Sequence, residues 1–213
     1  MHFLSADLEN YIDGHSEPEP VLLQELTRET HLKVIQPRMI TGHYQGRVLS
    51  LLSKIIAPIK ILEIGTYTGY SALCLAEGLQ LNGQLHTIDV NEELYAIQRK
   101  YFDKSDFGKN IVQHTGDAVE IVPKLNDVFD LIFIDAEKKS YDAYFEAAMT
   151  KTKSGSIILS DNVLWSGKVV EPVKKSDKAT EALLKYNHKL KTDPRVETVI
   201  LPIRDGLTLS RVL

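Results

Sequence analysis

The sequence predicts an α/β protein: a doubly wound, mostly parallel sheet of seven strands, with an antiparallel last strand and an N-terminal helical cap. From residue 59 onward, short and continuously apolar runs alternate five times with helical stretches, as expected for parallel strands buried on both faces. The last two apolar runs are separated only by Arg204 and Asp205, whereas a parallel crossover needs roughly a dozen residues. The last strand must therefore pair in the antiparallel sense.

The chain length is that of one domain, with residues 1–58 as the cap and residues 59–213 as the α/β core. In the cap, the spacing of apolar residues and the breaks at Pro37 and Pro58 predict three helices. The first rests on Leu4, Leu8, Tyr11 and Ile12. The other two are expected over residues 21–34 and 45–57, and the last of them is apolar enough to be well buried.

The core elements follow from apolar runs rich in Ile, Leu, Val and Phe, separated by amphipathic stretches. Strands are expected over residues 59–64, 84–88, 110–114, 130–134, 156–160, 196–203 and 206–212. Helices are expected over residues 70–80, 92–103, 118–125, 141–151 and about 177–191.

Composition excludes several classes of function. The chain has 213 residues, with 25 Lys+Arg against 29 Asp+Glu and a formal net charge of −4, which argues against a nucleic-acid binder. Its single cysteine, Cys74, excludes an intrachain disulfide framework and a thiolate metal cluster. Neither a signal peptide nor a membrane-spanning apolar run is visible. We therefore expect a cytoplasmic protein that acts on a small molecule, without nucleic-acid or membrane partners.

A glycine-containing turn follows the first predicted strand and precedes a helix. In an open α/β sheet the ligand crevice lies at the carboxyl ends of the strands. Gly65 lets the backbone approach a ligand without a Cβ in the way, and Gly69 begins the helix. Such a turn alone is more often only a tight connection, but acidic residues at other strand ends strengthen the case. We expect a nucleotide-like ligand above it.

The residues around this turn favour one ligand over another. Tyr67 stands where the dinucleotide fingerprint requires its middle glycine, and no phosphate loop ending in Gly-Lys-Ser/Thr is present. Glu63 would repel a pyrophosphate but attract an ammonium or sulfonium group. Asp89, at the end of the next strand, can accept hydrogen bonds from both ribose hydroxyls. With Gly116-Asp117-Ala118 at a third strand end, S-adenosylmethionine fits better than NAD.

Oxygen-bearing side chains follow two strands that are neighbours in the doubly wound order. Asp135 ends the fourth strand, and Asp161 and Asn162 end the fifth. Carboxylate and amide oxygens are the ligands that Mg²⁺, Ca²⁺ and Mn²⁺ prefer. Each residue alone would more often cap a helix or turn. Three of them on adjacent strand ends predict a divalent-cation site, with Mg²⁺ first among the candidates.

Lys138 lies three residues after Asp135 and could reach an acceptor hydroxyl held at this site. A nearby divalent cation lowers the pKa of a coordinated hydroxyl and disfavours protonation of a neighbouring amine. Both effects suit a general base. The spacing favours Lys138 over Lys139 as the residue that points inward.

Together these motifs resemble the cation-dependent class I O-methyltransferases, the group that contains the caffeoyl-CoA and catechol O-methyltransferases. The resemblance covers nearly the whole chain. Its parts are Glu63-Ile-Gly-Thr-Tyr-Thr-Gly-Tyr-Ser71, Phe133-Ile-Asp-Ala-Glu-Lys138, Asp161-Asn162, Arg204-Asp205-Gly206 and Glu17-Pro18-Glu19-Pro20.

The resemblance implies a role for each matching residue and implies homodimers. It implies a catalytic base at Lys138 and cation ligands at Asp135, Asp161 and Asn162. The implied cofactor contacts are Thr41, Glu63, Gly65, Tyr67, Ser71, Asp89, Ala118 and Asp135.

Two features depart from the family pattern. Glu137 replaces the second Asp of the Asp-Ala-Asp-Lys motif, and the specificity of the plant enzymes for CoA esters does not carry over. Trp165 is equally consistent with a wall for an aromatic acceptor and with a packing residue. The lysines of residues 168–178 indicate a solvated loop, or less readily an attraction for an anionic acceptor.

We therefore expect an S-adenosylmethionine-dependent and divalent-cation-dependent O-methyltransferase acting on a vicinal dihydroxy aromatic compound. Two alternatives stay open. One is an NAD(P)-dependent oxidoreductase with Asp89 on the ribose and Tyr141 or Lys138 as the acid. The other is a non-catalytic S-adenosylmethionine-binding protein that retains only the fold.

Overall fold

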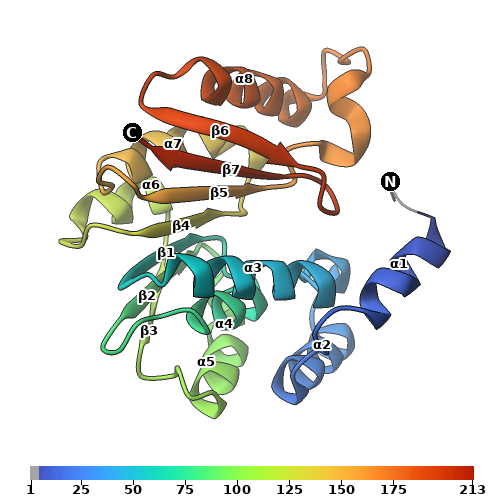
Figure 1. The fold of residues 1–213 in the computed structure, drawn as a ribbon, viewed down its shortest axis with the longest axis vertical. Helices are drawn as coiled ribbons and strands as arrows, with labels where there is room; N and C mark the ends of the chain where they lie inside the picture. Colours follow the sequence, from blue (N-terminus) through green and yellow to red (C-terminus); the bar gives the residue numbers. More distant parts are fainter. Residues whose placement is uncertain (1–4) are drawn as a thin grey trace.

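A seven-stranded sheet forms the centre of the molecule, with the strand order β3-β2-β1-β4-β5-β7-β6 (Figure 1). The computed structural model describes residues 5–213, so the start of the predicted cap, Leu4 included, lies outside the described residues. The strands are β1 (Lys60–Ile64), β2 (Gln84–Asp89), β3 (Ile111–Thr115), β4 (Leu131–Ile134), β5 (Ile157–Asp161), β6 (Val196–Leu201) and β7 (Leu207–Val212). β7 runs antiparallel to both of its neighbours, and the other pairings are parallel. The predicted fold class is confirmed.

The strands begin and end within two residues of their predicted positions. The largest difference is at β6, which stops at Leu201 because Pro202 has no N–H to continue the ladder. β1 and β4 lie at the centre of the sheet, and nearly all of their residues are buried. Their continuous apolar runs reflect this burial on both faces.

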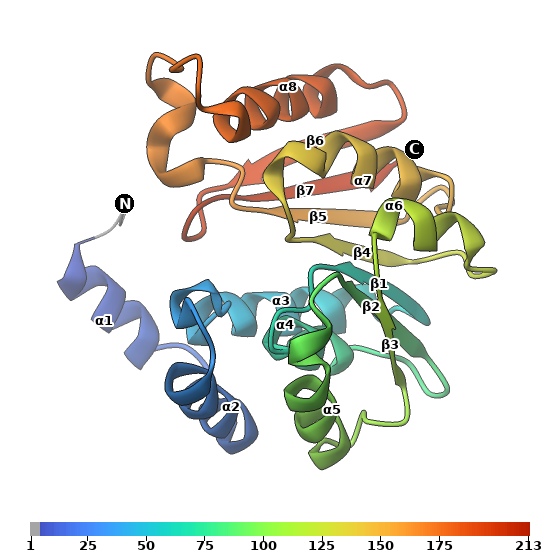
Figure 2. The same cartoon turned by 180° about the vertical axis from the view of Figure 1, so that it is seen from behind.

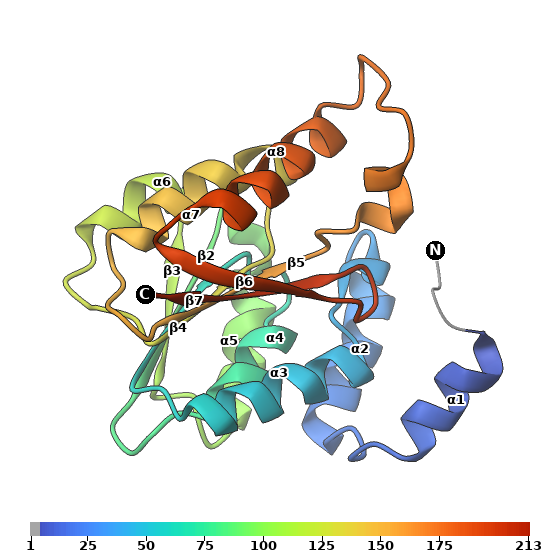
Figure 3. The same ribbon diagram turned by 45° about the horizontal axis from the view of Figure 1, so that its top comes forward.

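Helices cover both faces of the sheet (Figure 3). One layer contains α6 (Ala118–Ile121), α7 (Tyr141–Met149) and α8 (Lys178–Thr192), and the other contains α2 (Val21–Lys33), α3 (His43–Ile56), α4 (Tyr70–Ala76) and α5 (Tyr95–Lys104). Each layer has its own core. Leu62 of β1 packs in the α6–α8 core, whereas the adjacent Ile61 packs in the α2–α5 core. This alternation shows that one central strand supplies both cores.

The α4 helix is shorter than predicted, ending at Ala76 rather than near residue 80. Gly78 follows it, and a Cβ at Gly78 would collide with the backbone of Ser53 in α3. The chain therefore leaves the helix where the two elements touch most closely. Cys74, inside α4, is fully buried, and burial raises the pKa of its thiol to about 12. The cysteine is a packing residue rather than a nucleophile.

The cap helices form as predicted but are less buried than expected. Helix α1 (Ala6–Gly14) buries none of its residues and lies away from the sheet (Figure 2). The expectation of a well-buried third helix is wrong for one face of α3, where Leu51 is 60% exposed and Ile55 71% exposed. The buried face carries Leu49 together with polar residues such as Ser53, whose Oγ donates to the carbonyl oxygen of Leu75.

Among residues 5–213, no helix is both long and apolar enough to cross a membrane.

Two histidines pair across the outer strands β2 and β3. The Nδ1 of His86 lies 3.0 Å from the Nε2 of His114, and His86 Nε2 lies 3.4 Å from a carboxylate oxygen of Asp127. Burial, and then the neighbouring His114, lowers the pKa of His86 below 6.5. Burial also lowers the pKa of His114.

We expect this pair to make the protein less stable in mild acid. Because the folded-state pKa of His86 is depressed, the unfolded chain binds more protons as the pH falls through 6.5, and stability present at higher pH is lost. The free energy of unfolding in urea, measured for wild type and His86→Gln between about pH 7.5 and pH 5.5, should show a wild-type advantage that shrinks toward acid. His188→Gln, which removes an exposed histidine on α8, is the matched control. An advantage that is constant over this range would contradict the prediction.

Candidate functional site

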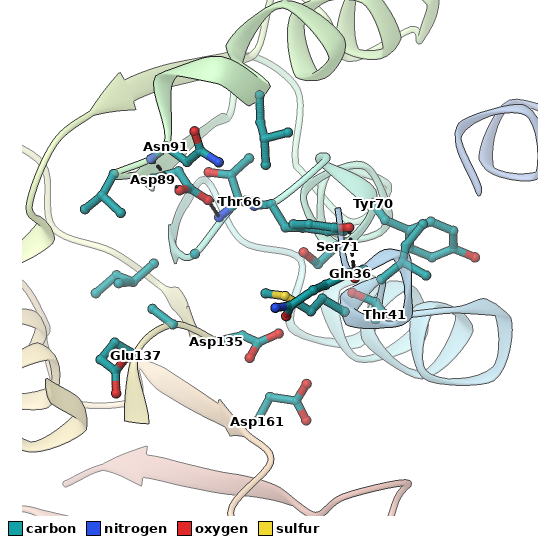
Figure 4. Close-up of a pocket in the computed structure, with 18 of the residues that line it drawn as sticks. Gln36, Thr41, Thr66, Tyr70, Ser71, Asp89, Asn91, Asp135, Glu137 and Asp161 are labelled. Atoms are coloured by element: carbon teal, nitrogen blue, oxygen red, sulfur yellow. Dashed lines mark hydrogen bonds between the residues drawn. The ribbon is translucent and has the colours of Figure 1, made fainter. Parts of the chain in front are cut away.

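The carboxyl ends of β1, β2, β4 and β5 border a cavity of about 1470 Å³ (Figure 4). It extends from α2 to the turn between β6 and β7. With one exception, Glu63, all the predicted site residues line this cavity: Thr41, Gly65, Tyr67, Ser71, Asp89, Ala118, Asp135, Lys138, Asp161 and Asn162. Residues separated by up to 121 positions in the sequence thus meet in one space, from Thr41 to Asn162.

The glycine turn after β1 is held by the carboxylate of Asp89. Asp89 Oδ2 accepts the backbone N–H of Thr66 at 3.0 Å and that of Tyr67 at 2.7 Å, and Oδ1 accepts the N–H of Asn91 at 2.9 Å. Three of the roughly four acceptor sites of the carboxylate are thus used, and Oδ1 keeps capacity for one further bond. Asp89 can therefore shape the turn and still accept a hydroxyl of a ligand.

Gly65 has a φ of +99°, a conformation that residues with a side chain rarely adopt. A Cβ at this position would collide with the carbonyl oxygen of Asp135, at the end of the neighbouring strand. The absent side chain leaves bare backbone at the cavity wall, which suits close contact with a flat ligand such as an adenosyl group.

Glu63 is the predicted contact that does not line the cavity. Its side chain is fully buried, and its Oε2 accepts the hydroxyl of Thr87 at 2.5 Å. Its Oε1 has no hydrogen-bond partner in the structure. Burial raises the pKa of this carboxyl to about 8, and the nearby hydroxyls of Ser71 and Thr87 offset only part of the rise. An unpartnered acidic oxygen behind Ser71, which does line the cavity, fits a ligand that brings a positive charge.

Asp135 and Asp161 lie side by side at the opposite end of the cavity, at the ends of β4 and β5 (Figure 4). Asp161 is 3% exposed, and its pKa is raised by burial and then by the charge of Asp135. Within residues 5–213 no group of three or more His, Cys, Asp or Glu side chains is arranged to hold a metal ion. Asn162, the residue after Asp161, also lines the cavity and offers an amide oxygen. Two mutually repelling carboxylates and an amide form a donor set that fits a hard divalent cation.

Lys138 points inward, as predicted, whereas Lys139 is exposed. The Nζ of Lys138 lies 2.9 Å from Asp135 Oδ1 and 2.6 Å from the hydroxyl oxygen of Tyr141. A buried amine next to an acceptor site can take up a proton from a substrate. From the sequence, a role for Tyr141 arises only in the alternative function, as the acid of an NAD(P)-dependent oxidoreductase. Its position three residues after Lys138 is the sequence feature that could have indicated a contact between the two side chains.

Gln45 and Arg204 were not predicted from the sequence. Gln45 is 1% exposed in α3, and its amide lowers the pKa of Asp161, offsetting part of the rise. Arg204 lines the cavity, and its Nη1 lies 3.4 Å from Gln45 Oε1. A polar residue in a helix predicted to be well buried was the signal that could have identified Gln45.

The structure also defines the positions of Glu137, Trp165 and the lysines of residues 168–178, whose roles the sequence leaves open. Glu137 is exposed and turned away from Asp135 and Asp161, and its Oε1 accepts the N–H of Lys139 at the start of the following 3₁₀ turn (Figure 4). Trp165 both lines the cavity and packs against the α6–α8 core. None of the lysines of residues 168–178 lines the cavity, which favours the solvated loop.

A family model described as "O-methyltransferase" matches residues 13–213. The chain is 34% identical to caffeoyl-CoA O-methyltransferase of Petroselinum crispum over 207 residues, which cover 91% of this chain and 84% of the relative. It is 33% identical to caffeoyl-CoA O-methyltransferase 1 of Arabidopsis thaliana, over 97% of this chain and 85% of the relative.

Solved structures resemble the whole chain. An O-methyltransferase from Bacillus cereus in complex with SAH superposes with a TM-score of 0.90 at 28% identity, covering 97% of both chains. The O-methyltransferase TomG from Streptomyces achromogenes in complex with SAM superposes with a TM-score of 0.89 at 26% identity, covering 97% of this chain and 96% of TomG.

The burial of Glu63 predicts that S-adenosylmethionine binds more tightly as the pH rises. Below about pH 8 the carboxyl is largely protonated without ligand and must lose that proton to pair with a cation. Measured by calorimetry, the affinity of wild type relative to Glu63→Gln should rise by up to about tenfold per pH unit and level off above pH 8.

Taking the ratio to Glu63→Gln cancels the titration of the ligand's own amine, because both proteins bind the same ligand. A ratio that does not change between about pH 6.5 and pH 8.5 would show that Glu63 does not face the bound cation.

Proposed function

The chain belongs to the O-methyltransferase family that includes the caffeoyl-CoA O-methyltransferases, and from this premise we propose that it methylates a hydroxyl of a vicinal dihydroxy aromatic compound in the presence of a divalent cation. Its activity is that of an S-adenosylmethionine-dependent O-methyltransferase. The observation that supports the finer proposal is the juxtaposition of Asp135, Asp161 and Asn162 with the buried amine of Lys138 in one cavity.

The glycine turn and its neighbours would bind the cofactor. Asp89 Oδ1 would accept a ribose hydroxyl, and the bare backbone at Gly65 would contact the adenosyl group. Glu63 with Ser71 would face the cationic amino-acid portion. This arrangement directs the methyl group toward the strand ends that carry Asp135 and Asp161. Orientation of this kind contributes about 7–11 kcal/mol to the barrier reduction when reactants are well aligned.

Asp135, Asp161 and Asn162 would hold the divalent cation. When bound, the cation supplies a site that chelates two neighbouring acceptor oxygens and lowers the pKa of the hydroxyl to be methylated. Lys138 then takes the hydroxyl proton as general base, and the buried site excludes water from the transfer. Trp165 gives the aromatic ring of the acceptor an apolar wall.

The two alternative functions are less well supported. Tyr67 at the place of the middle glycine and the matches to O-methyltransferases argue against an NAD(P)-dependent oxidoreductase. A protein that only bound the cofactor would have no need of a buried lysine hydrogen-bonded to both Asp135 and Tyr141. We therefore place the reaction, and not only the cofactor, in this cavity.

Purified protein given S-adenosylmethionine and catechol should form the monomethyl ether with Mg²⁺, and lose at least about 100-fold of that rate when EDTA is added. Product formation is followed by mass spectrometry. Turnover that persists undiminished in EDTA would contradict the cation requirement. No transfer to any member of a broad catechol panel would favour the binding-only alternative.

Asp161→Ala should abolish methyl transfer but leave the affinity for S-adenosylmethionine nearly unchanged, because Asp161 lies at the acceptor end of the cavity. Asp142→Ala removes an exposed carboxylate that pairs with Lys189 and serves as the matched control. Calorimetry and the same product assay measure the two quantities. A large loss of cofactor affinity in Asp161→Ala would contradict the assigned role.

We also propose that the enzyme is a homodimer, as the family resemblance implies. Leu51 and Ile55 on α3, and Leu8 and Tyr11 on α1, offer exposed apolar side chains for such an assembly. Light scattering after gel filtration should give about twice the mass of 24.0 kDa. A monomeric mass at micromolar concentration would contradict the proposal.

A further inference from the structure

The hydroxyl of Tyr141 is buried beneath the cavity, where the ends of β4 and β5 meet. Its Oη lies 2.6 Å from Lys138 Nζ, 2.8 Å from the carbonyl oxygen of Asp161 and 3.3 Å from that of Ile134. The ring is fully buried and packs edge-on against Tyr186, with the ring centroids 5.4 Å apart. No step of the proposed methyl transfer uses this hydroxyl.

The direction of these hydrogen bonds follows from the chemistry of the groups. A phenol has one proton, and carbonyl oxygens only accept, so the proton of Tyr141 is directed to the carbonyl of Asp161 or Ile134. Toward Lys138 the phenol oxygen can therefore act only as an acceptor.

The amine of Lys138 has three positions besides its bond to carbon. One faces Asp135 Oδ1 at 2.9 Å, and another faces Tyr141 Oη at 2.6 Å. In the neutral amine these two positions carry the N–H bonds, which leaves the lone pair in the third. Because Lys138 lines the cavity, the third position is the one that an acceptor hydroxyl can reach.

We propose that Tyr141 is a positioning residue that aims the lone pair of Lys138 at the acceptor hydroxyl; this inference rests on the proposed function. In the step that it serves, the acceptor O–H bond breaks and an N–H bond forms on Lys138. The electron pair remains on the acceptor oxygen, which then bonds to the methyl carbon while the C–S pair returns to sulfur. Tyr141 exchanges no proton. By bonding to the carbonyl of Asp161, it also ties the base to the strand that carries the cation ligands.

Two acceptors of different acidity test this role. Catechol must lose its proton to a base, whereas 4-nitrocatechol is far more acidic and ionises near neutral pH without one. Tyr141→Phe should lower kcat for catechol by about tenfold or more and that for 4-nitrocatechol by less than about threefold. KM for S-adenosylmethionine should stay unchanged. A merely structural defect would lower kcat equally for both acceptors.

Tyr186→Phe is the matched control. It removes a hydroxyl from the neighbouring buried ring, where the partner is Ser160 Oγ at 2.7 Å and not the lysine. This variant should show no difference between the two acceptors. Equal losses on both acceptors in Tyr141→Phe, no loss at all, or the same selective loss in Tyr186→Phe would each overturn the inference.

If Tyr141→Phe fails to fold, a second variant tests the inference. Replacement of Tyr141 by 3-fluorotyrosine keeps the ring and the hydroxyl but weakens the oxygen as an acceptor, so the selective loss on catechol should recur to a smaller extent. Equal rates for this protein and wild type would overturn the inference. If wild type methylates neither acceptor, the proposed function itself fails, which distinguishes the two conclusions.

Discussion

Two backbone hydrogen bonds set the geometry on which the site depends. The N–H of Gly65 donates to the carbonyl oxygen of Ile88 at 2.9 Å, and the N–H of Asp135 donates to that of Ile64 at 2.8 Å. Each bond continues a parallel ladder one residue past the strand end, so the turn that would hold the cofactor and the strand that would hold the cation are fixed in one frame. The contact between Gly65 and the Asp135 carbonyl shows how closely the two parts are packed. The sheet therefore holds the glycine turn and Asp135 in a fixed relation to each other.

The clustering of acidic residues at the site follows from the geometry of the sheet. Parallel strands end at the same edge of the sheet, and in this chain several of those strand ends carry acidic residues. At Glu63, no neighbouring lysine or arginine neutralises the carboxyl group. Burial raises the pKa values of the Glu63 and Asp161 carboxyls, and a positive charge placed beside either carboxyl would favour loss of its proton. The net charge of −4 is modest, but acidic residues are concentrated at one edge of the sheet, where they favour the binding of cations.

The doubly wound fold class, the antiparallel last strand and the place of nearly all the expected site residues in the cavity could be predicted because each depends on local pattern or on strand ends. What could not be predicted depends on contacts between distant segments. The exposure of Leu51 and Ile55 follows from which face of α3 meets α4, and apolarity alone does not reveal that face. Glu63 was expected in the cavity wall, but its depth behind Ser71 is a property of packing. The partner of Tyr141 is a backbone carbonyl, which leaves no trace in the side-chain sequence.

The burial of Cys74 has a practical consequence. It is the single thiol in the chain, it lies in α4 against Arg47 of α3, and its high pKa leaves almost no thiolate at neutral pH. An alkylating reagent can modify the native protein only when the α3–α4 contact opens. The rate of labelling at Cys74 therefore reports how often the α3–α4 contact opens. The measurement needs no introduced probe.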